Sequence, residues 1–221
     1  MKDALEQISH KFDARWSFFY RLRRGDRILE LGCGTGDNFR ELSRICPDIE
    51  FHGVDLYSPQ EAPPRILYQR VDLDHDSLPY NDAFFDGVIL THVLEHLREP
   101  LRIGREINRV MKPGGIIYVE APNWTSTLVP SFGFQRKQSG PFNFYDDPTH
   151  VRPWTKHGIF SFIGEICSLD VERVAIVRNW PRLPWDLVKI VFNLVRKRRR
   201  KVIAPFWNIY GWCVYGVGVK R

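Results

Sequence analysis

The sequence has few cysteines, and no two of them are close together. Cys33, Cys46, Cys167 and Cys213 are scattered along 221 residues, and none belongs to a CxxC pair. This excludes a dense disulfide framework of the kind found in small secreted domains, and the cysteines by themselves give no indication of a zinc site. We therefore expect reduced thiols and a cytoplasmic protein.

Long apolar segments are also missing. The amino-terminal stretch MKDALEQISHKFDARW is charged throughout, so no signal peptide is expected. Residues 202–219 carry no charge over 18 positions, which is marginal for a membrane span. Pro205 and Gly211 interrupt this segment, and its end, WCVYGVGVKR, has the pattern of a strand. We therefore expect no membrane-spanning helix.

The chain has no general excess of charge of one sign. Its formal net charge is +6, and the run RKRRRK at 196–201 carries six positive charges, so the rest of the chain is balanced. A nucleic-acid-binding surface spread over the protein is therefore not indicated. The basic run needs a local explanation.

The chain does contain an alternation of apolar strand-like runs and helical patterns. With 43% hydrophobic and 26% charged residues, its length suits one α/β domain. Continuous runs such as GVIL and GIIYV predict buried parallel strands with helices on both faces, which is a doubly wound fold. We expect strands at 27–32, 49–56, 66–73, 84–93, 115–123, 169–177 and 212–221, and helices at 3–22, 38–45, 100–111, 156–167 and from about 185.

Three glycines, Gly32, Gly34 and Gly36, follow the first expected strand within five positions. In a doubly wound sheet a ligand approaches the backbone at this turn, beside the amino terminus of a helix. Asp55 ends the second strand, where an acidic side chain accepts hydrogen bonds from ribose hydroxyls. The spacing G-x-G-x-G differs from the dinucleotide pattern, and Glu30 would repel a pyrophosphate but attract an ammonium or sulfonium group. These residues predict a nucleoside ligand without phosphates.

The stretch ILELGCGTGDN resembles motif I of the class I S-adenosylmethionine (SAM) dependent methyltransferases. GVDL, VDLDHDSLPYNDAFFDGVILTHVLEHL and REINRVMKPGGIIYVEAPN resemble later motifs in the same order, over about residues 25 to 123. The resemblance implies a seven-stranded, mostly parallel sheet of order 3-2-1-4-5-7-6 with the last strand antiparallel.

The same resemblance implies SAM as the cofactor. Glu30 would lie near the methionine ammonium, Asp55 at the ribose and Asp72 at the adenine amine; for Asp72, a turn-capping role is the alternative. The implied cofactor-binding residues are Glu30, Gly32, Cys33, Gly34, Gly36, Asp55, Leu56, Asp72, Leu73, Thr91 and His92.

Histidines and a glutamate gather after the fourth strand, where the methyl group would lie. HVLEH supplies His92, Glu95 and His96, and DPTHVRPWT adds His150. Transfer to a hydroxyl requires a base that removes the proton or a metal that acidifies it. We therefore expect His150, His96 and His92 as candidate catalytic residues, and all four residues as candidate ligands of a divalent metal. Plain helix-start roles for Glu95 and His96 are the alternative.

This segment resembles the Glu-x-x-Glu-His arrangement of small-RNA 2′-O-methyltransferases and ubiquinone-pathway enzymes, with His92 in place of the first Glu.

Residues 124–155 break the alternation and are rich in aromatic side chains. Such a loop is typical of a lid or binding wall, or else of a small packed subdomain. FNFYDDPTHVRPWT resembles a segment of bacterial methyltransferases of surface-polysaccharide and other glycan pathways, which implies a sugar hydroxyl as acceptor. Trp124, Tyr145 and Trp154 would then stack on sugar rings and Arg152 would hold the acceptor, unless the segment's polar residues only stabilise the loop.

Residues 183–201, LPWDLVKIVFNLVRKRRRK, predict an amphipathic helix. Asp186, Lys189, Asn193 and Arg196 form a narrow polar stripe on it. Such a helix can lie on an anionic membrane. The alternatives are a core helix followed by a solvated run of charge, and binding of nucleic acid by the run alone.

We predict one domain over 1–221, with an N-terminal helical region (1–24), a SAM-binding core (25–123), a substrate-side insertion (124–155) and a C-terminal part (156–221). The expected activity is SAM-dependent O-methylation of a sugar hydroxyl on a glycan or lipid-linked glycan. The protein would be cytoplasmic and associated with the inner face of the membrane. A quinone-type or small-metabolite O-methyltransferase, and a SAM-binding scaffold without catalysis, are the alternatives.

Overall fold

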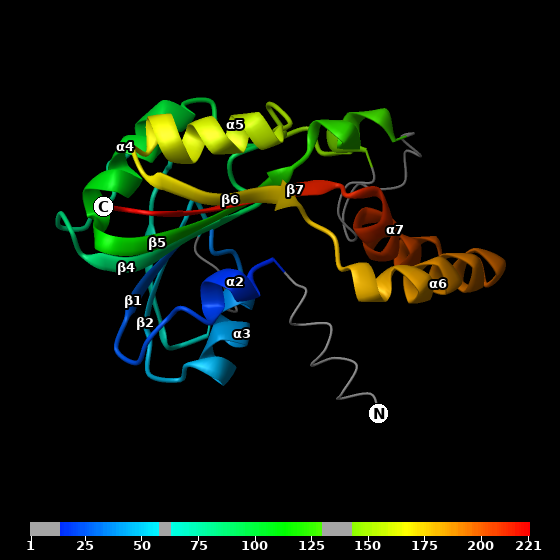
Figure 1. Ribbon diagram of the computed structural model, residues 1–221, viewed down its shortest axis with the longest axis horizontal. Coiled ribbons are helices and arrows are strands. Elements are labelled where there is room, and N and C mark those ends of the chain that lie inside the picture. The colour runs from blue at the N-terminus through cyan, green and yellow to red at the C-terminus, as the bar shows by residue number, and fades with distance from the viewer. Residues whose placement is uncertain (1–13, 58–62, 130–142) are drawn as a thin grey trace.

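The computed structural model describes residues 14–57, 63–129 and 143–221. They are built on a seven-stranded sheet of order β3-β2-β1-β4-β5-β7-β6, in which β7 is antiparallel to both of its neighbours (Figure 1). The strands are β1 (Arg27–Leu31), β2 (Glu50–Asp55), β3 (Ile66–Arg70), β4 (Phe85–Thr91), β5 (Met111–Pro122), β6 (Asp170–Ile176) and β7 (Cys213–Val219). The predicted strand order and the antiparallel last strand are confirmed.

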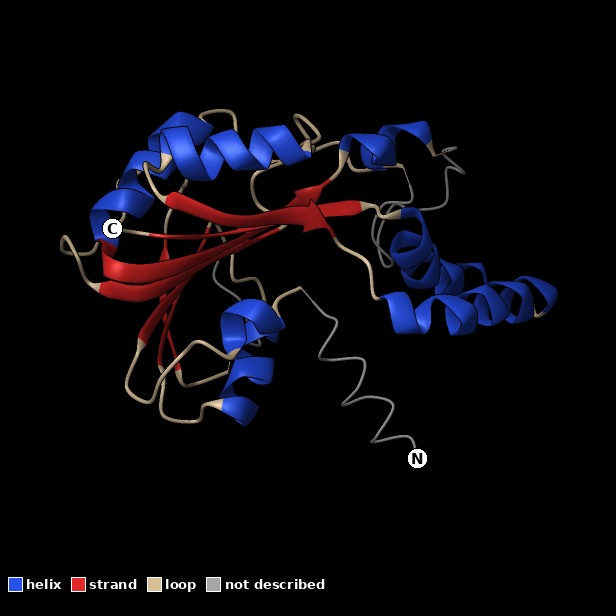
Figure 2. Ribbon diagram, viewed as in Figure 1, coloured by secondary structure: helices blue, strands red, loops and turns tan. Residues whose placement is uncertain are grey.

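Helices cover both faces of the sheet, α2 and α3 on one face and α4 and α5 on the other, as Figure 2 shows. The helices are α2 (Trp16–Phe19), α3 (Asp37–Ile45), α4 (Pro100–Val110), α5 (Lys156–Ser161), α6 (Leu183–Val195) and α7 (Ile203–Tyr210). Short helical turns lie at η1 (Trp124–Leu128), η2 (Phe144–Asp146), η3 (Phe162–Ile166), η4 (Trp180–Arg182) and η5 (Arg199–Val202). The expected helix at 3–22 lies largely outside the described residues, which retain its α2 part.

Alternation along β1 divides the core into two layers and orients the first site residue. Ile28 packs with Phe39 on the α3 side, whereas Leu29 packs with Ile107 on the α4 side. Successive side chains of a strand point to opposite faces, so Glu30 shares the orientation of Ile28. The Glu30 side chain therefore points to the face of the sheet that α3 covers.

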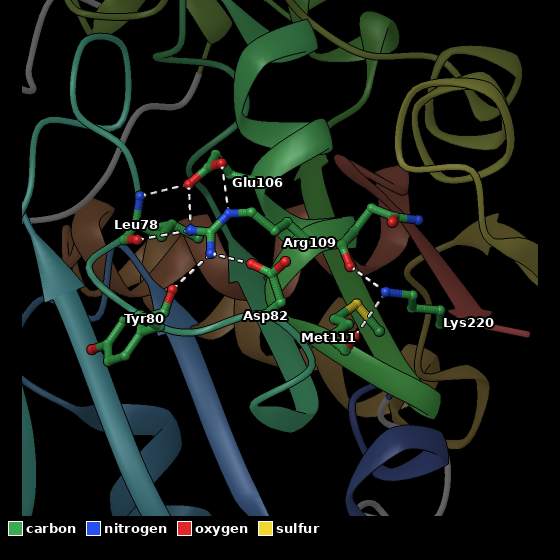
Figure 3. Close-up of polar contacts among 8 residues, drawn as sticks. Leu78, Tyr80, Asp82, Glu106, Arg109, Met111 and Lys220 are labelled. Carbon is green, nitrogen blue, oxygen red and sulfur yellow. Dashed lines mark hydrogen bonds and ion pairs between the residues drawn. The ribbon is translucent and has the colours of Figure 1, made fainter.

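A guanidinium fixes α4 to the turn that precedes β4 (Figure 3). Arg109 donates to both Glu106 carboxylate oxygens, at 3.0 and 2.8 Å, and to the carbonyls of Leu78 and Tyr80, at 2.9 and 2.7 Å. A further bond reaches Asp82 at 2.9 Å. Charge-assisted bonds of this kind are about twice as strong as neutral ones, so this network holds α4 firmly against the turn formed by residues 78–82.

The helix expected over 183–201 is shorter than predicted. It ends at Val195, because Lys197 adopts a φ of 54° that an α-helix cannot continue through. The chain then returns through η5 and α7, so that α6 and α7 form a hairpin beyond the end of the sheet at which β5 finishes (Figure 1).

Of the four residues in the polar stripe of α6, Asp186 and Asn193 are buried, whereas Lys189 and Arg196 are exposed. Asp186 is 1% exposed and accepts a hydrogen bond of 2.6 Å from the Asn208 amide on α7, and Asn193 is also buried. The apolar side chains of α6 point outward; Val191 and Val195 are 62% and 77% exposed. The alternative of a core helix with its apolar face packed inward is therefore wrong.

The uncharged segment 202–219 divides at Gly211, whose φ of 71° ends α7 before β7 begins. Within the described ranges, no helix is long and apolar enough to cross a membrane.

Candidate functional site

The glycine loop connects β1 to α3 with a backbone that side chains rarely adopt. Gly32, Gly34 and Gly36 have φ values of 68°, 47° and 83°. A Cβ on Gly32 would lie 2.4 Å from Val93 Cγ2, and one on Gly36 would lie 2.4 Å from Ile66 Cδ1. Left-handed φ values at all three positions, and close neighbours of the protein itself at Gly32 and Gly36, therefore account for these glycines, in addition to any ligand.

Asp55 ends β2 directly beside this loop. The Gly34 N–H donates to Asp55 Oδ2 at 2.9 Å, and the Tyr57 N–H donates to Oδ1 at 3.2 Å. Parallel pairing of β1 with β2 brings the two strand ends to one edge of the sheet. Because a carboxylate oxygen has two lone pairs, Asp55 retains acceptor capacity for ribose hydroxyls.

Glu30 is buried against the amino-terminal turn of α3. Its Oε1 accepts a hydrogen bond of 2.6 Å from the Asn38 amide, whose nitrogen also lies 3.4 Å from Thr91 Oγ1. Its Oε2 is buried without a hydrogen-bond partner in the described part of the chain. Burial raises the pKa of Glu30 to about 8, against the opposing effect of the Asn38 bond. An orphaned carboxylate oxygen of this kind calls for a cation or donor from outside the protein.

The residues expected at the adenine lie after β3. Asp72 accepts from the Asp74 N–H at 3.0 Å and pairs with the His75 ring at 2.9 Å, which lowers the pKa of the aspartate. Leu73 is buried in the core and Leu56 is 41% exposed after β2. The structure thus gives Asp72 the turn role that was the alternative; its contact with adenine stays a prediction.

His92 follows β4 and lies among acidic and sulfur atoms. Its Nδ1 is 3.2 Å from Glu95 Oε1, and its Nε2 is 3.7 Å from Glu120 Oε1 and 3.9 Å from Cys213 Sγ. Burial acts to lower the pKa of this imidazole. The Cys213 sulfur and Glu95 act in the opposite direction and outweigh burial, so the pKa of His92 lies well above its ordinary value. Its φ of 57° is unusual for a residue other than glycine.

A second cluster joins Glu95, His96 and His150, whose donor atoms lie within 4.8 Å of one another. Glu95 is fully buried, and its Oε2 has no hydrogen-bond partner within the described ranges. The His150 ring stacks on Phe144 and its Nδ1 is 2.6 Å from the Phe144 carbonyl, so this nitrogen carries the proton. Burial lowers the pKa of His150, which favours a neutral ring with a lone pair on Nε2.

Thr149 determines which nitrogen of His96 carries the proton. The Thr149 hydroxyl is 2.6 Å from Asp147 Oδ1, an acceptor, and therefore donates its single hydrogen there. His96 Nδ1, at 2.9 Å from the same hydroxyl, must then be the donor. The tautomer of His96 that this Asp147–Thr149–His96 chain selects carries its lone pair on Nε2.

The aromatic residues predicted to contact an acceptor separate into two groups. Trp124 and Tyr145 are 48% and 67% exposed, and Trp124 lines a pocket of about 420 Å³ together with Arg178. Trp154 lies in the core against Phe162, so the prediction that a sugar ring stacks on it is wrong.

Of the insertion 124–155, the structure describes residues 124–129 and 143–155. The Arg152 guanidinium donates to the Arg98 carbonyl at 3.0 Å. The remaining aromatic residues of the insertion, Phe132, Phe134 and Phe142, lie outside the described residues.

Sequence reasoning missed Asn38, Glu120 and Cys213. Asn38 had a usable signal, because the second position of a helix that starts at the glycine loop faces the preceding strand. Glu120 and Cys213 had a weaker signal: neighbouring strands β5 and β7 bring the two residues to one sheet edge only once the strand order is applied.

Comparisons with known proteins agree with this geometry. The family described as "Methyltransferase domain" matches residues 29–119. A probable S-adenosylmethionine-dependent methyltransferase of Mycolicibacterium smegmatis is 34% identical over 102 residues, which cover 45% of this chain and 39% of that protein. A 2-methyl-6-phytyl-1,4-hydroquinone methyltransferase of Synechocystis sp. is 26% identical over 222 residues, covering 92% of this chain and 62% of the relative. The chain thus spans between 39% and 62% of the length of these two relatives.

Among solved structures, an S-adenosylmethionine-dependent methyltransferase from Mesorhizobium loti matches with a TM-score of 0.62 at 18% identity, over 96% of this chain and 100% of that one. At such identity the likeness shows the fold alone. Residues 29–119 thus match a methyltransferase domain, and the described chain has the class I, Rossmann-like fold of that structure.

Proposed function

We propose that the protein transfers the methyl group of SAM to a hydroxyl of a glycan or lipid-linked glycan. The observation that carries the cofactor assignment is the buried Glu30 carboxylate, with its unpartnered Oε2, beside a left-handed glycine loop and Asp55. Such a carboxylate suits the methionine ammonium of SAM, and Asp55 suits the ribose hydroxyls. Donor and acceptor then need alignment in a dry site more than covalent help.

The cofactor part is tested by calorimetric titration of SAM into the full chain. Asp55→Ala removes acceptors for the ribose and is expected to weaken SAM about 10- to 100-fold, since hydrogen bonds to a charged group contribute about 1.5–3 kcal/mol. Asp48→Ala, at an exposed carboxylate before β2, is the matched control and is expected to leave affinity unchanged. Equal SAM affinity in both variants would remove the basis of the assignment.

The proton of the acceptor hydroxyl is taken, in this proposal, by His96. The Asp147–Thr149–His96 chain supports this role, because it leaves a lone pair on the partly exposed ring. His150 and His92 would flank the acceptor and assist. Glu95, His96 and His150 are also ligand types that fit a divalent metal, which would serve the same step by acidifying the hydroxyl.

The acceptor is tested by SAM-dependent methyl incorporation into glycan and lipid-linked glycan fractions, with His96→Gln as the variant and His52→Gln as the control. His52 lies in β2, outside both clusters and outside the pocket that Trp124 lines. Product that forms with wild type and the control but not with His96→Gln supports the proposal. Product formed equally by His96→Gln would exclude this histidine as the base.

A hydroquinone is the second candidate acceptor. The Synechocystis relative named for a hydroquinone substrate covers 92% of this chain, which favours testing one. Methylation of a hydroquinone without any glycan product would replace the glycan acceptor. SAM binding without methylation of either class would indicate a scaffold.

The same proposal includes attachment to the inner face of an anionic membrane through α6. Its exposed apolar side chains include Leu187, Val188, Val191 and Val195, and the exposed cations Arg196 and Lys197 follow directly. Each cation near an anionic surface contributes about 1 kcal/mol. The α6–α7 hairpin lies beyond the end of the sheet at which β5 finishes (Figure 1), and β4, which His92 follows, runs parallel to β5. A hairpin bound to a membrane would therefore bring this end of the sheet close to a lipid-linked acceptor.

Sedimentation with vesicles of phosphatidylcholine alone or with phosphatidylglycerol tests this attachment. The double variant Val191→Asp, Val195→Asp should lose binding to the anionic vesicles at least about 10-fold. Leu101→Asp, at an exposed apolar position on α4, should bind like wild type. Equal affinity for both lipid compositions, or loss in the Leu101 variant alone, would refute the role of α6.

A further inference from the structure

Three neighbouring strands bring a histidine, a glutamate and a cysteine together at one edge of the sheet. His92 directly follows Thr91, which pairs with Glu120 of β5. Cys213 is the first residue of β7 and pairs with Pro122, two residues beyond Glu120. The position of each of the three is therefore fixed by sheet register rather than by a mobile loop.

The ligand atoms of these three side chains are too far apart for good hydrogen bonds but close enough to be compared with the ligand atoms around a metal ion. His92 Nε2 lies 3.7 Å from Glu120 Oε1 and 3.9 Å from Cys213 Sγ, and the three donor atoms lie within 4.8 Å of one another. Around a tetrahedral Zn²⁺, bond lengths of about 2.0–2.3 Å place such ligand atoms roughly 3.4–3.6 Å apart. Closing the set on one ion would thus take a few tenths of an ångström at the two histidine distances and at most about 1.3 Å between Glu120 and Cys213.

Outer hydrogen bonds orient two of the three groups as metal sites require. The Glu95 carboxylate lies 3.2 Å from His92 Nδ1, which leaves Nε2 directed at Glu120 and Cys213. The Tyr118 hydroxyl donates to Glu120 Oε2 at 2.5 Å, which leaves Oε1 facing the histidine. A carboxylate behind a ligating imidazole is the common partner that fixes its ring and raises its basicity.

We propose that His92, Glu120 and Cys213 form a binding site for a divalent cation of borderline-soft character, such as Zn²⁺. Thiolate and imidazole select such ions over Mg²⁺ and Ca²⁺. The Cys213 thiolate and the Glu120 carboxylate balance the two positive charges of the ion. The side chain of His92 is 37% exposed, so a fourth coordination position opens towards solvent.

An open fourth position is the pattern of catalytic rather than structural zinc sites. An ion there would acidify an acceptor hydroxyl near the transferable methyl group; this consequence rests on the proposed function, whereas metal binding itself does not. The cluster of Glu95, His96 and His150 is a different site, because it lacks a thiol and its ligands come from the loops after β4 and η2.

The test uses the full chain, stripped with a chelator and titrated with Zn²⁺ against a chromophoric competitor, and separately with Co²⁺ under anaerobic conditions. We expect one Zn²⁺ per chain and, with Co²⁺, a thiolate charge-transfer band with tetrahedral d–d bands. Cys213→Ser should abolish the charge-transfer band, and Glu120→Gln and His92→Ala should each weaken Zn²⁺ at least about 10-fold. Cys46→Ser, whose thiol lies outside the cluster, should behave like wild type.

The Co²⁺ spectrum of the wild-type protein tests thiolate ligation by itself. The proposal can therefore be refuted even if one of the variants fails to fold. Absence of the charge-transfer band from wild type, or its persistence in Cys213→Ser, would overturn it. Zn²⁺ binding that survives His92→Ala but is lost in His150→Ala would assign the ion to the other cluster and also overturn it. SAM is titrated into the same metal-free samples. If SAM binds but Zn²⁺ does not, the metal site fails and the methyltransferase assignment stands; if Zn²⁺ binds but SAM does not, the reverse holds.

Discussion

Replacing Glu30 by glutamine tests whether ionisation of this buried carboxyl destabilises the folded protein. The carboxyl is 4% exposed, one of its oxygens has no hydrogen-bond partner within the described residues, and burial raises its pKa to about 8. Glutamine has nearly the same shape, stays neutral and can still accept the amide hydrogen bond from Asn38. The substitution therefore removes the ionisation and leaves the packing.

The direction and size of the effect follow from the difference between the folded and unfolded pKa values. Taking 4.5 for the unfolded chain, the folded state of wild type binds the Glu30 proton more tightly, so stability falls as the pH rises from 4.5 and levels off above 8. The loss amounts to about 3 kcal/mol at pH 7 and about 5 kcal/mol above pH 8 as an upper limit. Glu30→Gln escapes this loss and should be the more stable protein at alkaline pH.

Urea unfolding of the protein without SAM at pH 5 and pH 8.5 measures the difference. Glu172→Gln, at an exposed ion pair with Arg21, is the control and should follow wild type. Identical pH dependence in wild type and Glu30→Gln would refute the argument, because it would mean that the carboxylate is solvated in the folded state.

SAM should reverse the preference for the protonated carboxyl. If the methionine ammonium lies against Glu30, binding at pH 7 expels the proton, and calorimetry in buffers of different ionisation heat should detect release of about 0.9 proton per SAM. The Glu30→Gln variant should release none and bind more weakly. Tight binding to wild type without proton release would show that Glu30 does not receive the cation.

Three further changes probe the loop, the scaffold and the proton chain. Gly36→Ala adds a methyl group 2.4 Å from Ile66 Cδ1 at a φ of 83° and should cost about 2–3 kcal/mol in urea unfolding; Gly114→Ala, at a φ of 79°, should cost only about 1 kcal/mol, and equal losses would contradict the steric part. Arg109→Met removes five hydrogen bonds and should cost about 3 kcal/mol without changing SAM affinity, and an unchanged urea midpoint would count against the network. Thr149→Val removes the hydroxyl that links Asp147 to the His96 imidazole and should lower kcat about 10-fold or more at constant KM for SAM. An unchanged kcat would contradict the role of this chain in catalysis.

The sheet and the cofactor loop could be predicted because their signals are local. The buried central strands β1 and β4 are short and mostly apolar, and Glu30, the glycines and Asp55 sit at strand ends that the strand order brings together. The Cys213 contact could not be predicted in the same way, because 121 residues separate it from His92 and its partners depend on the register of β7. Trp154 misled for another reason: its backbone pairs with Asn123, which draws a loop residue into the core.

Helix α6 shows where periodicity stops being informative. The spacing of Asp186 and Asn193 identifies a polar stripe, but a stripe faces water on most helices, whereas these two residues are buried here. The reason is that Asn208 supplies a donor for the Asp186 carboxylate, so the buried polar contact is satisfied within the hairpin. The apolar side is left in solvent, at a cost of roughly 25 cal/mol for each Å² exposed. An arrangement of this kind lowers its free energy when another apolar phase covers that side, which is the physical basis of the proposed attachment to an anionic membrane.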